Sequence, residues 1–129
     1  MTTSHGSKDD FPLEEMGDYK GRMAELPEGY MVTFESIPAG MGGPDLFKGL
    51  PDDACQSPHW GYLFKGKFKA IYTDGNEDVV SAGEAYYLRP GHVYEALEDV
   101  ESVEFSPTAE WQQTIEQVSK NAEAMQQAD

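Results

Sequence analysis

The chain has 129 residues, and its length predicts a single domain. Thirteen glycines, eight prolines and an aromatic content of 12% favour a turn-rich β fold over a helical bundle. With 24 acidic and 9 basic residues the formal net charge is −15, which repels phosphate backbones and anionic membrane surfaces. We therefore expect no nucleic acid and no membrane among its partners.

The cysteine content does not require an oxidising compartment. Cys55 is the single cysteine, so no disulfide can form within the chain. No apolar run approaches the roughly 18 residues of a spanning helix, and the N-terminus lacks the apolar segment of a signal peptide. These features predict a cytoplasmic protein.

Residues 1–10 are polar and are expected to form a disordered tail, in which His5 is solvated. Residues 11–129 are expected to form one domain, with a barrel at about 30–107 and a helix at about 107–125. Between residues 11 and 28 the apolar residues are irregularly spaced, which indicates an arm over the domain that can include a turn of helix.

Short segments rich in β-branched and aromatic residues, bounded by turn-forming residues, predict the strands. They cover residues 30–37, 59–64, 67–73, 79–80, 85–88, 93–97 and 102–105. Asp74-Gly75-Asn76 is a strong hairpin signal. Short strands at close spacing predict an all-β antiparallel barrel or sandwich.

The C-terminal segment predicts an amphipathic helix. Pro107 suits its first turn, and Ser106 is the candidate N-cap. One apolar stripe follows at helical spacing, made of Trp111, Ile115, Val118, Ala122 and Met125. We expect this stripe to pack on the outer wall of the barrel, with a dimer contact as the alternative.

Three glycines in the middle of the chain carry a family resemblance. Gly66, Gly83 and Gly91 lie at the spacings of the glycines in two cupin motifs, G-x5-H-x-H-x3,4-E-x6-G and G-x5-P-x-G-x2-H-x3-N. Over about residues 30–107 the chain resembles the cupin family, and residues 58–66 and 86–92 look like those of small single-domain bacterial cupins. The resemblance implies a double-stranded β-helix, or jelly-roll barrel, that often dimerises.

The metal-ligand positions of the family hold other residues here. Counting back from the closing glycine of the first motif places Asp53 and Cys55 at its two histidines and His59 at its glutamate. In the second motif Tyr94 replaces the histidine, and His92 lies two residues before it. The resemblance therefore supports the fold better than it supports the family's metal chemistry.

Cys55, His59 and His92 are nevertheless residues that suit a divalent metal, either zinc or iron, nickel or manganese. Cys55 and His59 are four residues apart and can reach one ion if the chain bends between them. Asp53 or Tyr94 is expected to complete the shell, and Tyr94 is the candidate catalytic residue, which would orient a substrate or donate a proton. A metal-free polar pocket or a purely structural role for the same residues stays open.

Strand parity makes a further prediction. If His59 points inward, then Gly61 and Leu63 do too, whereas Trp60 and its alternate neighbours point outward. Such outward aromatic residues need a partner surface, for which the helix, the arm or a second subunit is a candidate; a homodimer is therefore expected as one arrangement.

Two weaker candidates concern acid–base and nucleophilic chemistry. Glu35 and Glu104 would be general bases if they faced inward, but each is expected to be an outward, solvated carboxylate. Cys55 would be a nucleophile if paired with His59 or His92, but the chain shows no oxyanion-hole motif.

Taken together, the residues predict a small-molecule site inside a barrel. The leading hypothesis is metal-assisted catalysis on a small organic acid or carbonyl compound. The resemblance implies dioxygenase, isomerase, decarboxylase or lyase chemistry without choosing among them. One alternative is a non-catalytic module that senses or carries a small ligand without metal; another is an interaction protein that uses Trp60 or Trp111.

Overall fold

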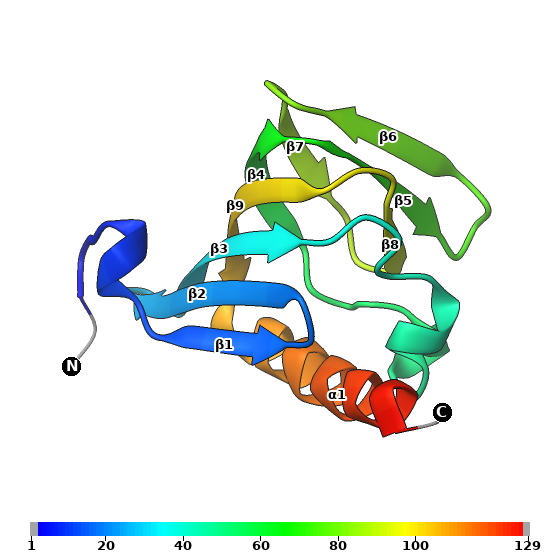
Figure 1. The fold of residues 1–129 in the computed structure, drawn as a ribbon. Helices are drawn as coiled ribbons and strands as arrows, with labels where there is room; N and C mark the ends of the chain where they lie inside the picture. Colours follow the sequence, from blue (N-terminus) through cyan, green and yellow to red (C-terminus); the bar gives the residue numbers. More distant parts are fainter. Residues whose placement is uncertain (1–2, 128–129) are drawn as a thin grey trace.

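The computed structural model describes residues 3–127 as two antiparallel sheets and one α-helix (Figure 1). The strands are β1 (Leu13–Met16), β2 (Tyr19–Leu26), β3 (Tyr30–Ile37), β4 (His59–Lys65), β5 (Lys67–Tyr72), β6 (Glu77–Ser81), β7 (Ala85–Leu88), β8 (His92–Ala96) and β9 (Val100–Pro107). The helix is α1 (Thr108–Gln127), and short 3-10 turns are η1 (Lys8–Asp10), η2 (Pro44–Phe47) and η3 (Pro51–Asp53). The predicted all-β class with a C-terminal helix is confirmed.

The two sheets pack face to face around one apolar core. The larger sheet has the order β1-β2-β3-β9-β4-β7, and the smaller one has the order β6-β5-β8. The longest pairing joins β3 to β9 over their full length, from Tyr30 opposite Pro107 to Ile37 opposite Val100. Inward side chains of both sheets form the core, among them Ile37, Leu63, Phe68, Ala70, Leu88 and Val100.

The segment predicted to be an arm is instead a β-hairpin. β1 and β2 pair with each other, and β2 pairs with β3, which extends the larger sheet by two strands. This segment shows no clear alternation of apolar and polar residues because β1 is an exposed edge strand and β2 is fully buried only at Tyr19 and Gly21. In the segment predicted to be a tail, Lys8–Asp10 form a 3-10 turn with exposed side chains.

Helix α1 closes the space between the sheets at one end, rather than packing on the outer wall (Figure 1). Its buried stripe meets a second apolar cluster from η2 and the following loop, made of Leu46, Phe47, Leu50 and Cys55. Met125, the last residue of the predicted stripe, is exposed. Within residues 3–127 no helix combines the length and the apolar character needed to cross a membrane.

Gly66, one of the three glycines that match the cupin motifs, occupies a position that favours glycine. Gly66 joins β4 to β5 with φ +90°, and a Cβ at this position would lie 2.1 Å from the Asp99 carbonyl oxygen. Both the left-handed backbone and the close approach of another chain segment exclude a side chain here. This turn carries the chain from the larger sheet to the smaller one.

Candidate metal centre and cavity

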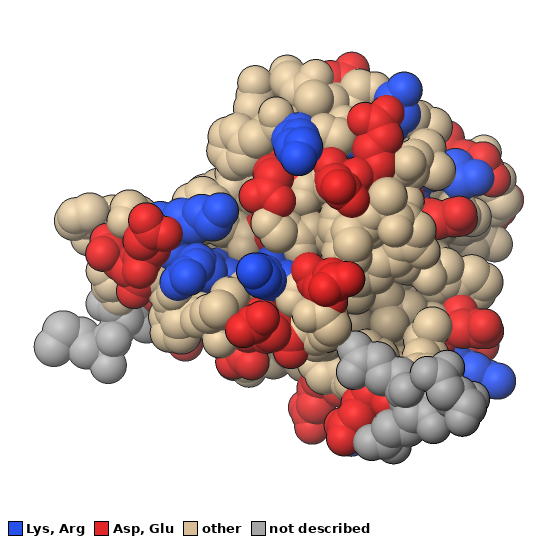
Figure 2. Space-filling view, in the orientation of Figure 1, with Lys and Arg blue, Asp and Glu red and all other residues tan. Residues whose placement is uncertain are grey.

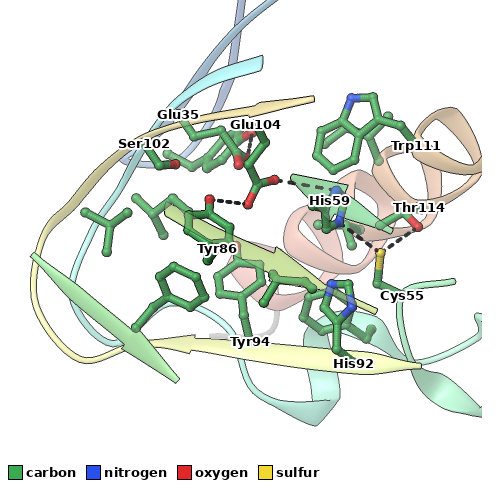
Figure 3. A pocket seen from close by; sticks show the side chains of 18 of the residues that line it. Glu35, Cys55, His59, Tyr86, His92, Tyr94, Ser102, Glu104, Trp111 and Thr114 are labelled. Atoms are coloured by element: carbon green, nitrogen blue, oxygen red, sulfur yellow. Dashed lines mark hydrogen bonds and ion pairs between the residues drawn. The ribbon is translucent and has the colours of Figure 1, made fainter. Parts of the chain in front are cut away.

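A cavity lies between the two sheets, and α1 contributes to its wall (Figure 3). Its apolar walls come from residues such as Ile37, Phe68, Leu88 and Val100. Its volume is about 40 Å³, which is above the roughly 10–15 Å³ that one water requires. The site therefore has room for an ion or a small ligand.

Cys55, His59 and His92 meet in this cavity. One donor atom from each residue lies within 4.8 Å of the other two, and all three residues are buried. The Cys55 Sγ atom is 3.5 Å from His59 Nε2, and the two imidazole centroids are 5.1 Å apart. The prediction that the two imidazoles share one cavity is confirmed.

Backbone pairing brings these residues together. The Cys55 N–H donates to the His92 carbonyl at 2.8 Å, and the Gly91 N–H donates to the Cys55 carbonyl at 2.8 Å. The loop before β4 is thereby fixed against the start of β8. His59 then begins β4 with its side chain inward, which places it four residues after Cys55 on the same side.

Both imidazoles are held through Nδ1. The His92 Nδ1–H donates to the Arg89 carbonyl at 2.7 Å, which leaves Nε2 with its lone pair. His59 Nδ1 lies 2.6 Å from Ser106 Oγ and 3.6 Å from Glu104 Oε1, while its Nε2 faces Cys55. This is the arrangement in which partners of Nδ1 orient a histidine toward a metal. Ser106, predicted to cap the helix, is instead a partner of His59.

Burial keeps the three groups neutral at neutral pH. Desolvation lowers the pKa of His59 to about 3. It also lowers the pKa of His92 to about 4, with a smaller contribution from the nearby His59. Desolvation raises the pKa of the Cys55 thiol to about 11. A thiolate–imidazolium pair is therefore disfavoured, whereas neutral imidazoles are the form that binds metal.

Glu35 and Glu104 face the cavity, so the prediction that both are solvated was wrong. Their residues are only 7% and 8% exposed. The Tyr19 hydroxyl donates to Glu35 Oε2 at 2.5 Å, and the Tyr86 hydroxyl donates to Glu104 Oε2 at 2.6 Å. Desolvation raises the pKa of both carboxyls, and the charge of Glu104 raises the pKa of Glu35 further. They form a second polar group beside the cluster (Figure 3).

The remaining predicted residues divide between the cavity and the surface. Tyr94 lines the cavity, packs edge-on against Phe47 with ring centroids 5.4 Å apart, and has a pKa raised well above its usual value by burial. Asp53 is exposed and its Oδ1 accepts the Gly49 N–H, so it lies outside the cluster that it was predicted to complete.

Two residues of α1 belong to the site. Trp111 is buried, as expected for a member of the apolar stripe and contrary to the alternative in which it forms an interaction surface; it lies edge-on to His59 with ring centroids 5.5 Å apart. The Thr114 hydroxyl lies 3.2 Å from Cys55 Sγ. Thr114 was not predicted; its place one turn after Trp111 on the buried stripe was the only signal available.

The opposite face of the larger sheet is aromatic, as the parity of β4 predicted. Trp60, Tyr62 and Phe64 are 45%, 40% and 55% exposed, whereas Leu63 is 0% exposed. Trp60 lies beside Tyr87 and Tyr30, with ring centroids 5.3 and 6.5 Å apart. We call Tyr30, Trp60, Tyr62, Phe64, Tyr87 and Phe105 the outer aromatic face.

Comparison with solved structures finds similar folds. A RmlC-like cupin from Shewanella frigidimarina aligns with a TM-score of 0.59 at 18% identity, covering 82% of this chain and 93% of that one. KdgF from Halomonas sp. aligns with a TM-score of 0.58 at 18% identity, covering 82% and 94%. A variant of oxalate decarboxylase from Bacillus subtilis aligns with a TM-score of 0.59 at 17% identity, covering 83% of this chain and 30% of that one. No family model and no curated protein sequence matches the chain.

Proposed function

We propose that this chain carries out metal-assisted catalysis on a small carbonyl compound or organic acid, because it has the cupin superfamily fold and a buried Cys–His–His cluster. The single observation that carries this proposal is the convergence of the three donor atoms inside the cavity. Cys55, His59 and His92 would hold the ion, and three protein ligands leave a further position open for water or substrate.

The spacing of two of the three donors fits a metal. Zinc bonds of about 2.3 Å to sulfur and about 2.0 Å to nitrogen, at a tetrahedral angle, place those two ligand atoms roughly 3.5 Å apart. Cys55 Sγ and His59 Nε2 are separated by 3.5 Å. When bound, a divalent ion would supply Lewis-acid or redox chemistry.

Three residues would handle protons and substrate. Tyr94 would orient the substrate or donate a proton from its neutral hydroxyl, because burial keeps its pKa well above 10.0. Glu35 and Glu104 would accept protons in the cavity, since their raised pKa values make them stronger bases than solvated carboxylates. All three residues already line the cavity, so none of these roles requires a charged side chain to move in from the surface.

A second candidate function is a non-catalytic module that binds or senses a small ligand without metal. It is favoured by the contacts that the donors already make with protein groups. Cys55 Sγ lies 3.2 Å from Thr114 Oγ1 as well as 3.5 Å from His59 Nε2. These hydrogen bonds hold the cluster together in the absence of an ion.

Elemental analysis of protein purified without a metal-affinity tag separates the two candidates. We expect stoichiometric metal in the native chain and none in a variant with His59→Ala and His92→Ala. Replacing exposed His5 with alanine is the matched control and should leave metal content unchanged. Native protein that contains no metal and shows no thermal shift with zinc, iron, manganese or nickel would contradict the catalytic proposal.

The outer aromatic face supports a homodimer. At about 200 Å² per aromatic side chain, six half-exposed side chains present on the order of 500–600 Å². Two such faces, fully covered, would bury about 1,000–1,200 Å² together, which reaches the roughly 1,000 Å² of a specific interface. The six residues carry no charge, which makes this face the place where two chains of net charge −15 can approach. We propose that a second copy of the chain covers it.

The oligomeric state tests this proposal. By light scattering after size exclusion, we expect a dimer for the native chain and a monomer for Trp60→Glu. The control is Val79→Glu, which places the same charge at an exposed apolar residue of the smaller sheet and should remain dimeric. A monomeric native chain would contradict the proposal.

A further inference from the structure

We propose that Met16 and Ile115 control access to the cavity, and that ions and small ligands enter between them from a groove on the surface. We call these two residues the gate. The inference rests on the proposed function for the identity of what passes, since the metal ion and the substrate would both use this entrance. It gives Met16 an access-determining role that is separate from metal binding and catalysis.

The groove lies between the β1–β2 hairpin and α1. Its volume is about 490 Å³, and residues of β1, β2 and α1 line it. Two of these residues, Met16 and Ile115, line the buried cavity as well. They are therefore the side chains that separate the surface groove from the cavity of the Cys–His–His cluster.

The rest of the cavity wall is more firmly closed. Within residues 3–127 the side chains that line the cavity are buried except for four half-buried ones, which belong to Met16, Tyr86, Tyr94 and Ile115. The Tyr86 hydroxyl is fixed by its hydrogen bond to Glu104, and Tyr94 packs against Phe47. The gate is consequently the part of the wall that opens most easily.

Met16 can move aside without a change in the backbone. Its unbranched side chain has three rotatable bonds, and exposed side chains change rotamer within picoseconds to nanoseconds. The Ser119 hydroxyl donates to Met16 Sδ at 3.3 Å, which is a weak bond because a thioether is a poor acceptor. Met16 also lies at the end of β1, which is an edge strand paired only with β2. One weakly held side chain thus closes the gate.

The charge of the groove favours the approach of a divalent ion. In the part of the chain that the structure describes, the groove lining contains no lysine or arginine, but it contains four exposed glutamates, Glu14, Glu15, Glu116 and Glu123. Figure 2 shows acidic side chains over the region where β1 and α1 lie. Negative charge along a groove raises the local concentration of cations. A metal ion would therefore be concentrated on the outer side of the gate.

Cys55 reports access to the cavity, because it is the single cysteine of the chain and lines the cavity. In metal-free protein its thiolate sulfur displaces iodide from iodoacetamide, a small uncharged reagent, and the thiol proton goes to solvent. Mass spectrometry measures the rate. We expect Met16→Ala to raise this rate several-fold by widening the gate, and Met16→Phe to lower it several-fold. The matched control is Met23→Ala, because Met23 lines the groove but not the cavity, and the rate should stay unchanged.

A third variant distinguishes opening of the gate from unfolding of the whole chain. Ser119→Ala removes the hydrogen bond to Met16 and places a better helix former on α1, so it should raise the alkylation rate without lowering stability. Alkylation through the unfolded state would instead follow the unfolding constant of each variant, which urea denaturation measures. Met16→Phe and Ser119→Ala carry the test even if Met16→Ala does not fold.

The outcomes separate this inference from the proposed function. Equal alkylation rates in the native chain, Met16→Phe and Ser119→Ala overturn the gate, and so do rates that follow the unfolding constant alone. Metal content is measured independently by elemental analysis, so either result leaves the metal site standing. Rates that change as expected in a chain that binds no metal support the gate and contradict only the metal-assisted function.

Discussion

The two faces of the larger sheet have opposite chemistry at neighbouring positions of the same strands. On β4 the inward residues are His59 and Leu63, and the outward ones are Trp60, Tyr62 and Phe64. An antiparallel sheet ordinarily places apolar residues inward and polar residues outward. Here the inward face carries imidazoles and carboxyls and the outward face carries aromatics. Exposed apolar patches and buried titratable groups often mark binding or catalytic sites, so both faces are expected to be functional.

The largest expected effect is a difference in the free energy of unfolding between a variant of the inward face and a variant of the outward face. Leu63→Ala leaves a cavity in the core and should lower the free energy of unfolding by about 2–5 kcal/mol. Tyr62→Ala, on the outward face of the same strand, should lower it by less than about 1 kcal/mol when the protein is diluted below the dissociation constant of the proposed dimer. Urea denaturation of both variants measures this difference, and equal losses would contradict the assignment of faces.

The buried titratable groups give the stability a distinctive pH dependence in the metal-free protein. The pKa values of His59 and His92 are about 3 and about 4 in the folded chain, below the ordinary 6.5, so the unfolded chain binds more protons and stability falls as the pH falls below 6.5. Glu35 and Glu104 have raised pKa values, so their contribution increases stability as the pH falls toward 4.5. The two effects oppose each other between pH 6.5 and 4.5.

Below pH 4.5 the glutamates are protonated in both states, and only the histidine effect remains. We therefore expect a shallow dependence down to about pH 4.5 and a loss of several kcal/mol between there and about pH 3. Glu35→Gln removes one opposing contribution, so its stability should already fall from about pH 6.5. Urea denaturation across this range, with Glu77→Gln as control, measures both curves; coinciding curves would show that Glu35 is not buried.

Removing a partner of His59 on the inward face is expected to have a smaller effect, which is a loss of metal affinity. Glu104→Gln keeps the shape of the side chain but removes the carboxylate 3.6 Å from His59 Nδ1. We expect zinc affinity to fall by roughly 10–100-fold, the usual effect of losing an outer-shell partner. Competition with a chromophoric chelator measures it. Glu101→Gln, on the outward side of the same strand, is the control, and an equal loss there would point to a general charge effect.

The smallest effect is expected at the edge of the outer aromatic face. Phe64→Ser removes a side chain that is 55% exposed, so the stability of the monomer should change by less than about 0.5 kcal/mol. The dissociation constant of the proposed dimer should nevertheless rise measurably. Sedimentation equilibrium measures it, and an unchanged constant would place Phe64 outside the contact.

The sequence predicted the parts of this molecule that depend on local chemistry. Strand positions follow from β-forming residues between turns, so 30–37 and 85–88 match the observed strands. The Gly66 turn follows from a backbone that only glycine adopts, and the outward position of Trp60 follows from the alternation along a strand. Cys55, His59 and His92 stood out as candidate ligands because thiol and imidazole groups suit a borderline-soft ion such as zinc.

Tertiary structure alone decided which face of a strand meets the core and what covers an apolar stripe. β3 carries apolar residues on both faces, so its sequence does not show which face is inward. The pairing of β3 with β9 within the larger sheet places Glu35 on β3 and Glu104 on β9 on the same, inward face. The apolar stripe of α1 predicted that one face of the helix is buried. Only the structure shows that this face packs against η2 and closes the cavity. The hairpin of β1 and β2 gains its place from pairing with β3. Such contacts join residues distant in the sequence, and local patterns do not encode them.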